Sequence, residues 1–184
     1  PRGKGGAVPE VELRVHPTML PEGHLISKVD GVFNAIYVKG DAVGDTLYYG
    51  RGAGDMPTGS AVVSDIADIG NNIVCGATKQ SLSFKDSGVR IKKINEIESM
   101  YYFRFTVLDR PGVLSKISGI LGEYNISIAS VIQKGRKVGE AVPVVILTHM
   151  AKEKNGLRAV KEIDKLKVVS DKTFYIRVEG GEGS

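Results

Sequence analysis

The sequence has little of what a disulfide-stapled, metal-binding or membrane-spanning protein needs. Its single cysteine, Cys75, excludes an internal disulfide, and His16, His24 and His149 show no metal-ligand spacing, so we expect no metal site. No apolar run approaches the roughly 18 residues of a membrane span. The first residues, PRGKGGAVPE, lack the hydrophobic core of a signal peptide. These absences predict a cytoplasmic location and no membrane partner.

The 184 residues do contain an ordinary globular composition with unevenly placed charge. They are 42% hydrophobic and 25% charged, which is enough for one or two cores. Residues 1–100 carry 11 Lys or Arg against 12 Asp or Glu, whereas residues 101–184 carry 14 against 9. A modest basic excess is usually a solvated surface, so nucleic acid is the less favoured partner.

From residue 101 onward the pattern predicts a ferredoxin-like domain of the α+β class. Residues 101–108 (YYFRFTVL) alternate as a strand, whereas apolar side chains from Val113 to Tyr124 recur at helical spacing. The other expected elements are strands at 126–133 and 141–149, a helix at about 156–166 and a strand at 172–178. This β-α-β-β-α-β order gives one antiparallel sheet with two helices on one face.

The residues before this domain predict only a partial α/β segment. We expect strands at 11–17, 33–40 and 46–50 and a helix at 60–69. Such a small sheet cannot easily cover both of its faces, so we interpret this part as the tail of a larger domain that begins upstream of Pro1. The predicted division is residues 1–70, a linker at 71–100 with one short strand (VRIKKI), and a domain at 101–179.

Two long strings resemble a known family. The first, VHPTMLPEGHLISKVDGVFNAIYVKGDAVGDTLYYGRGAGDMPTGSAVVSDIADI, looks like the C-terminal part of the catalytic region of homoserine dehydrogenase. The second, EIESMYYFRFTVLDRPGVLSKISGILGEYNISIASVIQ, looks like the regulatory ACT domain that follows it in many bacterial forms. The LDRPGVL string alone would identify only an ACT domain, because that module is attached to many metabolic enzymes.

The resemblance implies an NAD- or NADP-dependent interconversion of L-aspartate 4-semialdehyde and L-homoserine in the full-length enzyme. In the family, the Rossmann domain and the catalytic lysine precede the segment seen here, and the glycines of YGRGAGDMPTGS have the wrong spacing for a dinucleotide fingerprint. We therefore assign no catalytic residue, expect no tightly bound cofactor, and predict that this chain alone is inactive. The resemblance also implies a homodimer or higher homo-oligomer through the ACT domain and threonine as effector, with residues 71–100 transmitting the signal.

The glycine-rich YGRGAGDMPTGS stretch is the candidate cofactor contact. Its glycines let a backbone come close to a neighbour, and the helix expected to begin near Pro57 or Thr58 offers free N–H groups to an anion. By resemblance, Gly52 and Gly54 lie beside the nucleotide. The alternative, that these glycines serve a tight turn and close helix packing, stands about level with it.

The LDRPG turn is the candidate effector site. A free amino acid has a carboxylate and an ammonium, so a receptor pairs N–H donors at a helix start with a nearby acceptor. The expected effector-binding residues are Asp109 for the ammonium, Gly112 and Val113 as donors, Asn125 to complete the polar ring, and Ile126 or Gln133 to shape it. The alternative is equally favoured: Asp109 only caps the helix and Pro111 only suits its first turn. In that case the domain serves only for assembly.

Two other functions fit parts of the pattern. One is a stand-alone ACT-type amino-acid-binding regulatory protein with an appended small sheet, which we expect to carry a start methionine where this sequence has Pro1, so a fragment is favoured. The same element order also suits RNA-recognition domains, which display stacking aromatics on their first and third strands. The expected third strand here, AVPVVILTH, has no aromatic residue, so the RNA function is disfavoured.

Overall fold

The chain forms two compact units in this computed structural model, which describes residues 9–76, 88–133, 135 and 140–179. One unit holds the described residues up to Pro21 together with those from Gly88 onward. The other begins at Glu22 and ends before Gly88. The first unit is therefore discontinuous in sequence, whereas the predicted division placed its boundaries at residues 70 and 100 and had consecutive segments only. That three-part division itself stays a prediction.

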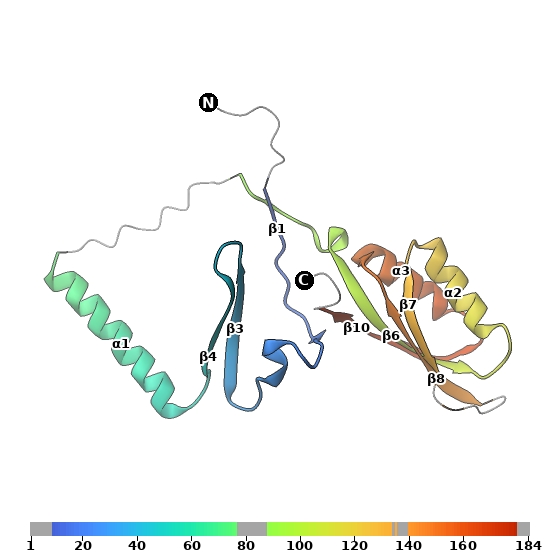
Figure 1. Ribbon diagram of the computed structural model, residues 1–184, viewed down its shortest axis with the longest axis horizontal. Helices are drawn as coiled ribbons and strands as arrows, with labels where there is room; N and C mark the ends of the chain where they lie inside the picture. The colour runs from blue at the N-terminus through green and yellow to red at the C-terminus, as the bar shows by residue number, and fades with distance from the viewer. Residues whose placement is uncertain (1–8, 77–87, 134, 136–139, 180–184) are drawn as a thin grey trace. The chain divides into compact units, whose positions relative to one another are not determined.

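The first unit contains the ferredoxin-like domain (Figure 1). Its main elements are β6 (Glu98–Leu108), α2 (Val113–Glu123), β7 (Ile128–Gln133), β8 (Ala141–Thr148), α3 (Glu153–Ile163) and β10 (Val169–Val178). Shorter elements are β1 (Glu10–Val11), β2 (Thr18–Met19), β5 (Arg90–Ile91), η2 (Ile94–Glu96) and β9 (Ala151–Lys152). The predicted β-α-β-β-α-β order is confirmed.

The sheet of this unit has the order β2-β10-β6-β8-β7. The four long strands pair antiparallel, and β2 adds to the β10 edge in parallel. Alternate β6 side chains, from Tyr101 through Phe103 and Phe105 to Val107, are almost fully buried and share one core with α2 and α3. Both helices therefore cover one face of the sheet, as the period-2 pattern of residues 101–108 predicted.

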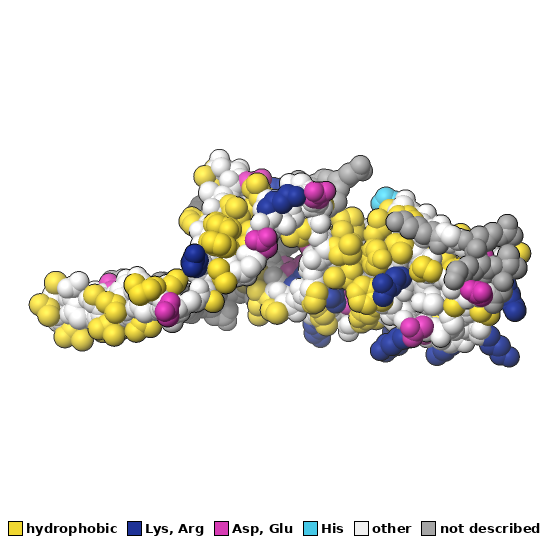
Figure 2. All heavy atoms as spheres, turned by 90° about the horizontal axis from the view of Figure 1, so that it is seen from below, with side chains coloured by type: hydrophobic (Ala, Val, Ile, Leu, Met, Phe, Trp, Pro, Cys, Tyr) yellow, Lys and Arg dark blue, Asp and Glu magenta, His cyan; other side chains and the backbone are white. Residues whose placement is uncertain are grey.

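The second unit is a hairpin followed by a long helix. Its elements are η1 (Leu25–Lys28), β3 (Phe33–Gly40), β4 (Gly44–Arg51) and α1 (Asp55–Val74), and β3 pairs with β4 along its whole length. Among the described residues, every buried hydrophobic side chain lies in the first unit and none lies in this one. Figure 2 shows hydrophobic side chains exposed along α1, where Val62, Ile66 and Ile69 are 51–64% exposed. The predicted apolar stripe of this helix is present, and the described residues of the unit leave it exposed.

Several boundaries differ from those predicted. The expected strand at 11–17 is replaced by the two-residue strands β1 and β2, and Pro17, which has no N–H for a ladder, lies between them. The helix expected at 60–69 runs as α1 from Asp55, with Pro57 in its first turn, where proline is tolerated. The helix expected at 156–166 is α3, which begins at Glu153 and ends at Ile163.

In the described part of the chain, no helix is both long and apolar enough to cross a membrane. The same residues contain no cluster of three or more His, Cys, Asp or Glu side chains that could hold a metal ion.

Candidate functional site at the start of α2

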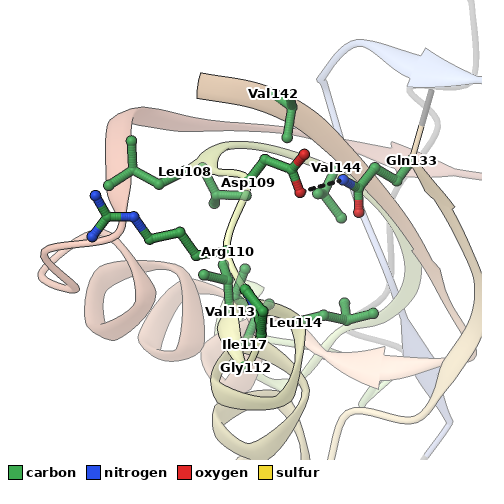
Figure 3. A pocket seen from close by; sticks show the side chains of 12 residues that line it. Leu108, Asp109, Arg110, Gly112, Val113, Leu114, Ile117, Gln133, Val142 and Val144 are labelled. Atoms are coloured by element: carbon green, nitrogen blue, oxygen red, sulfur yellow. Dashed lines mark hydrogen bonds between the residues drawn. The ribbon is translucent and has the colours of Figure 1, made fainter. Parts of the chain in front are cut away.

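A hollow of about 180 Å³ lies where β6 turns into α2 (Figure 3). Small-molecule sites for drug-sized ligands usually exceed about 300 Å³, so this hollow suits a smaller ligand. Its wall is formed by the β6–α2 turn, the first turn of α2, and the facing strands β7 and β8. The lining residues are Val107, Leu108, Asp109, Arg110, Pro111, Gly112, Val113, Leu114, Ile117, Gln133, Val142 and Val144.

The turn is shaped by its own sequence. Asp109 continues the sheet by one bridge, with its N–H donating to the Glu140 carbonyl at 2.9 Å. Gly112 then adopts φ +83°, a left-handed conformation that favours glycine, and caps α2. The Lys116 N–H donates to the Gly112 carbonyl at 3.1 Å. The chain thus passes from strand to helix within four residues and brings the helix start to the edge of the sheet.

The polar groups of the hollow are few and close together. The Gln133 Nε2 amide donates to Asp109 Oδ1 at 3.5 Å, and Figure 3 shows these side chains pointing toward one another while Arg110 points away. The first turn of α2 itself carries no acidic residue that would oppose an anion at the positively polarised helix start. Val142 and Val144 of β8 supply apolar lining. A carboxylate acceptor, backbone donors and an apolar wall together suit a small zwitterion with a short side chain.

The structure brings together three of the five predicted effector residues. Asp109, Gly112 and Val113 line the hollow, and so does Gln133. The Val113 N–H is already directed at the Arg110 carbonyl at 3.4 Å, so it is a weakened donor for a ligand.

Asn125 and Ile126 do not line this hollow. They follow the C-terminal end of α2, and a helix of 11 residues separates its two ends by about 16 Å. Asn125 adopts φ +55° and donates its N–H to the Gly122 carbonyl, which ends the helix. Ile126 is 3% exposed in the core. Neither residue therefore lines this hollow, and the expectation that they complete and shape the effector site stays a prediction.

The sequence missed the part of the lining that comes from β8. Val142 and Val144 belong to a strand that begins about 30 residues after α2 starts. Their alternation with exposed Ala141 and Pro143 was the available signal, since it places both valines on the face that carries the helices.

The two glycines proposed to contact cofactor have local reasons for being glycine. A Cβ on Gly52 would lie 1.6 Å from Asn34 Nδ2, so any other residue there requires the Asn34 amide to move. Gly54 precedes α1 with φ +124°, which favours glycine. Asp55 is the first residue of α1, and its carboxylate accepts the Met56 N–H at 2.7 Å. This negative charge lies where an anion would approach, so the helix start alone is a poor phosphate site.

A second, open hollow of about 310 Å³ lies on the β3–β4 hairpin beside these glycines. It is lined by Asn34, Ala35, Ile36, Tyr48, Tyr49, Gly50, Arg51 and Gly52. Gly50 faces Asn34 across the hairpin, and Ile36 faces Tyr48. Because positions 50 and 52 are glycines, the backbone there is uncovered and lies next to the Asn34 side-chain amide. A flat group could therefore approach this backbone closely.

Two family models match the chain, one to each of the segments that the sequence singled out. The model described as homoserine dehydrogenase matches residues 3–67, and the ACT domain model matches residues 101–168. The homoserine dehydrogenase of Neisseria gonorrhoeae is 43% identical over 182 residues, covering 96% of this chain and 41% of that protein. That of Helicobacter pylori is 44% identical, covering 92% of this chain and 39% of that protein.

A solved structure agrees with these relatives. The crystal structure of a homoserine dehydrogenase from Thiobacillus denitrificans is 42% identical and superposes with a TM-score of 0.79, covering 91% of this chain and 39% of that one. The chain thus spans about two fifths of the length of the relatives it matches. It is homologous to homoserine dehydrogenase and corresponds to that enzyme's C-terminal region, in which a segment of the enzyme is followed by an ACT domain.

Proposed function

We propose that the chain is the regulatory end of a cytoplasmic homoserine dehydrogenase that interconverts L-aspartate 4-semialdehyde and L-homoserine with NAD or NADP. The observation that carries this proposal is the order of the two matched segments along one chain. In this proposal Gly52 and Gly54 lie beside the nucleotide of the complete enzyme, and the hollow next to Asn34 leaves room for it. Because the Asp55 carboxylate is negatively charged, we expect the nucleotide to contact the backbone near Gly52 rather than the start of α1.

The first prediction concerns activity. The purified 184-residue chain is expected to give no homoserine-dependent reduction of NADP or NAD, because it has no dinucleotide fingerprint and no assigned catalytic residue. The measurement is NADPH or NADH absorbance with homoserine as substrate, with an intact homoserine dehydrogenase as the positive control. Turnover by the purified chain above the buffer rate contradicts the prediction.

The ACT domain is proposed to bind L-threonine in the hollow at the start of α2. Asp109 would accept hydrogen bonds from the ammonium, and the backbone around Gly112 would donate to the carboxylate. The volume of about 180 Å³ fits a small amino acid. Calorimetric titration of the purified chain with threonine, isoleucine, methionine and serine tests this. Binding of threonine alone supports the proposal, and no heat with any of the four leaves assembly as the role of the domain.

The ACT domain is also proposed to pair with a second copy along β7. One edge of the sheet is covered by β2, whereas β7 has β8 as its only partner among the described residues. Its Val131 and Ile132 are 40% and 45% exposed. An exposed apolar edge strand is a template for pairing with another chain. Because Gln133 ends β7 and lines the hollow, a second copy at this edge would lie next to the effector.

The second prediction tests this edge. The Val131→Lys variant is expected to weaken dimerisation by at least about tenfold, because lysine on an edge strand disfavours pairing with another strand. Ile94→Lys, which changes a 50% exposed side chain in η2, is the matched control and is expected to dimerise like the unchanged chain. Sedimentation over a concentration series measures both. Equal dimerisation of the two variants counts against pairing at β7.

A further inference from the structure

Residues 9–19, here called the strap, lie along the first unit although they precede the second unit in sequence. β1 of the strap pairs in parallel with β5, where the Arg90 N–H donates to the Pro9 carbonyl at 2.9 Å and the Lys92 N–H to the Val11 carbonyl at 3.0 Å. At its other end, β2 pairs with the last residues of β10, and the Glu179 N–H donates to the Met19 carbonyl at 3.0 Å. Both ends of the strap are therefore hydrogen-bonded to residues that follow the second unit.

Charged side chains reinforce the β1–β5 end. Arg90 Nε donates to Glu10 at 2.7 Å, and Lys92 Nζ donates to Glu12 at 2.7 Å. The Lys92 ammonium, followed by the Arg14 guanidinium, lowers the pKa of Glu12. Isolated surface ion pairs contribute little to stability, whereas several charges that share partners contribute more. Glu12 is such a shared partner, since it contacts both Lys92 and Arg14.

Arg14 connects the middle of the strap to the sheet. Its Nη1 donates to the buried Ser99 Oγ at 3.0 Å and to Glu179 at 2.9 Å, while Nη2 donates to the Glu98 carbonyl at 3.2 Å and to Glu12. Its side chain is 21% exposed. A guanidinium presents its donors in a fixed fork, so one side chain holds the first residues of β6 and the residue after β10 at once.

We propose that the strap is a second mechanical connection between the ACT sheet and residues 22–87, and that Arg14 is its anchor. The chain enters residues 22–87 directly after β2 and returns from them directly before β5. The first passage is hydrogen-bonded to the ACT sheet through the β2–β10 pairing, and the second is hydrogen-bonded to β1 of the strap, which Arg14 in turn attaches to β6. An effector-dependent change in the sheet thus reaches residues 22–87 from both ends, and not only through residues 71–100. That regulatory consequence rests on the proposed function, whereas the anchoring itself does not.

Amide hydrogen exchange of the full 184-residue chain, followed by nuclear magnetic resonance, tests the anchor. In Arg14→Ala, the amides of Lys92 and Glu179, which donate to the strap, are expected to exchange at least about tenfold faster, because a multiply bonded charged group is lost. The Leu108 amide, at the far end of β6, donates to Val168 and serves as the internal reference. Its exchange is expected to stay unchanged.

Two further variants complete the test. Arg14→Lys keeps the charge but lacks the fork, so exchange intermediate between those of the unchanged chain and Arg14→Ala is expected. Lys28→Ala removes an exposed ion pair with Glu22 outside the strap and is expected to leave Lys92 and Glu179 unchanged. Unchanged exchange of Lys92 and Glu179 in Arg14→Ala, or equal acceleration at Leu108, overturns the proposal. Either result is independent of whether threonine binds.

Discussion

Replacing Glu153 by alanine is expected to lower the free energy of unfolding of the first unit, here called the ACT unit because it contains the ACT domain, by about 3–5 kcal/mol. Glu153 is 1% exposed at the start of α3. Its carboxylate accepts hydrogen bonds from Tyr101 Oη at 2.7 Å and Arg177 Nε at 2.9 Å. The variant leaves the Arg177 guanidinium, 15% exposed, without its buried partner. Removing one member of a buried ion pair costs more than the pair contributes, because the remaining charge stays desolvated.

The electrostatics of this cluster agree with that expectation. The hydrogen bond to Glu153 raises the pKa of Arg177. Burial first, and then the same carboxylate, raises the pKa of Tyr101 well above its usual value. Both groups therefore keep their protons in the folded chain, and both depend on Glu153 for a partner. Three elements that are distant in sequence, β6, α3 and β10, meet at this one side chain.

Urea denaturation of the purified chain, followed by circular dichroism, measures the loss of stability. The matched control is Glu162→Ala in the same helix, which removes an exposed hydrogen bond from Tyr124 Oη at 2.6 Å. We expect that variant to lose less than about 1 kcal/mol, as exposed polar pairs usually do. Equal losses in the two variants would show that Glu153 is no more important than a surface carboxylate.

The sequence predicted those features of the fold that depend on local period. The alternation of residues 101–108 and the helical spacing from Val113 predicted β6 and α2, and the element order then fixed a ferredoxin-like sheet. The sequence did not predict the cluster around Glu153. Tyr101 and Glu153 are 52 residues apart, and the spacing of hydrophobic residues carries no information on contacts between such distant positions. The strap was missed for a related reason. Two-residue strands have no measurable alternation, and their pairing depends on partners about 80 and 160 residues later.

The candidate site shows the same division. Asp109, Gly112 and Val113 are neighbours in sequence, so the strand-to-helix turn placed them together without long-range information. Asn125 does not line the hollow, because the whole length of α2 separates it from Asp109 in space although both flank the same helix in sequence. Glycine at position 52 leaves room for the Asn34 amide, and this contact across the hairpin cannot be predicted from local sequence.

Substitutions at the start of α2 are expected to reduce threonine binding without unfolding the ACT unit. Asp109→Ala removes the proposed acceptor of the ammonium, and a hydrogen bond to a charged group is worth about 1.5–3 kcal/mol, so affinity should fall by about tenfold to a hundredfold. Gly112→Val acts through the backbone. A Cβ there meets no atom within 4 Å, but φ +83° is strongly disfavoured for a β-branched residue, so the turn must change and its donors move.

Matched control variants distinguish an effector-binding site at the start of α2 from a turn that only caps this helix. Asp171→Ala changes an exposed aspartate of β10, and Gly119→Ala changes a glycine of α2 that has open space around it and ordinary helical φ. Both are expected to bind threonine like the unchanged chain in calorimetric titration. Thermal melting of all four variants shows whether the fold is retained. If Asp109→Ala and Gly112→Val titrate like their controls, the turn is only a helix cap, because a site built on the Asp109 carboxylate cannot keep its affinity for an ammonium group once that carboxylate is gone.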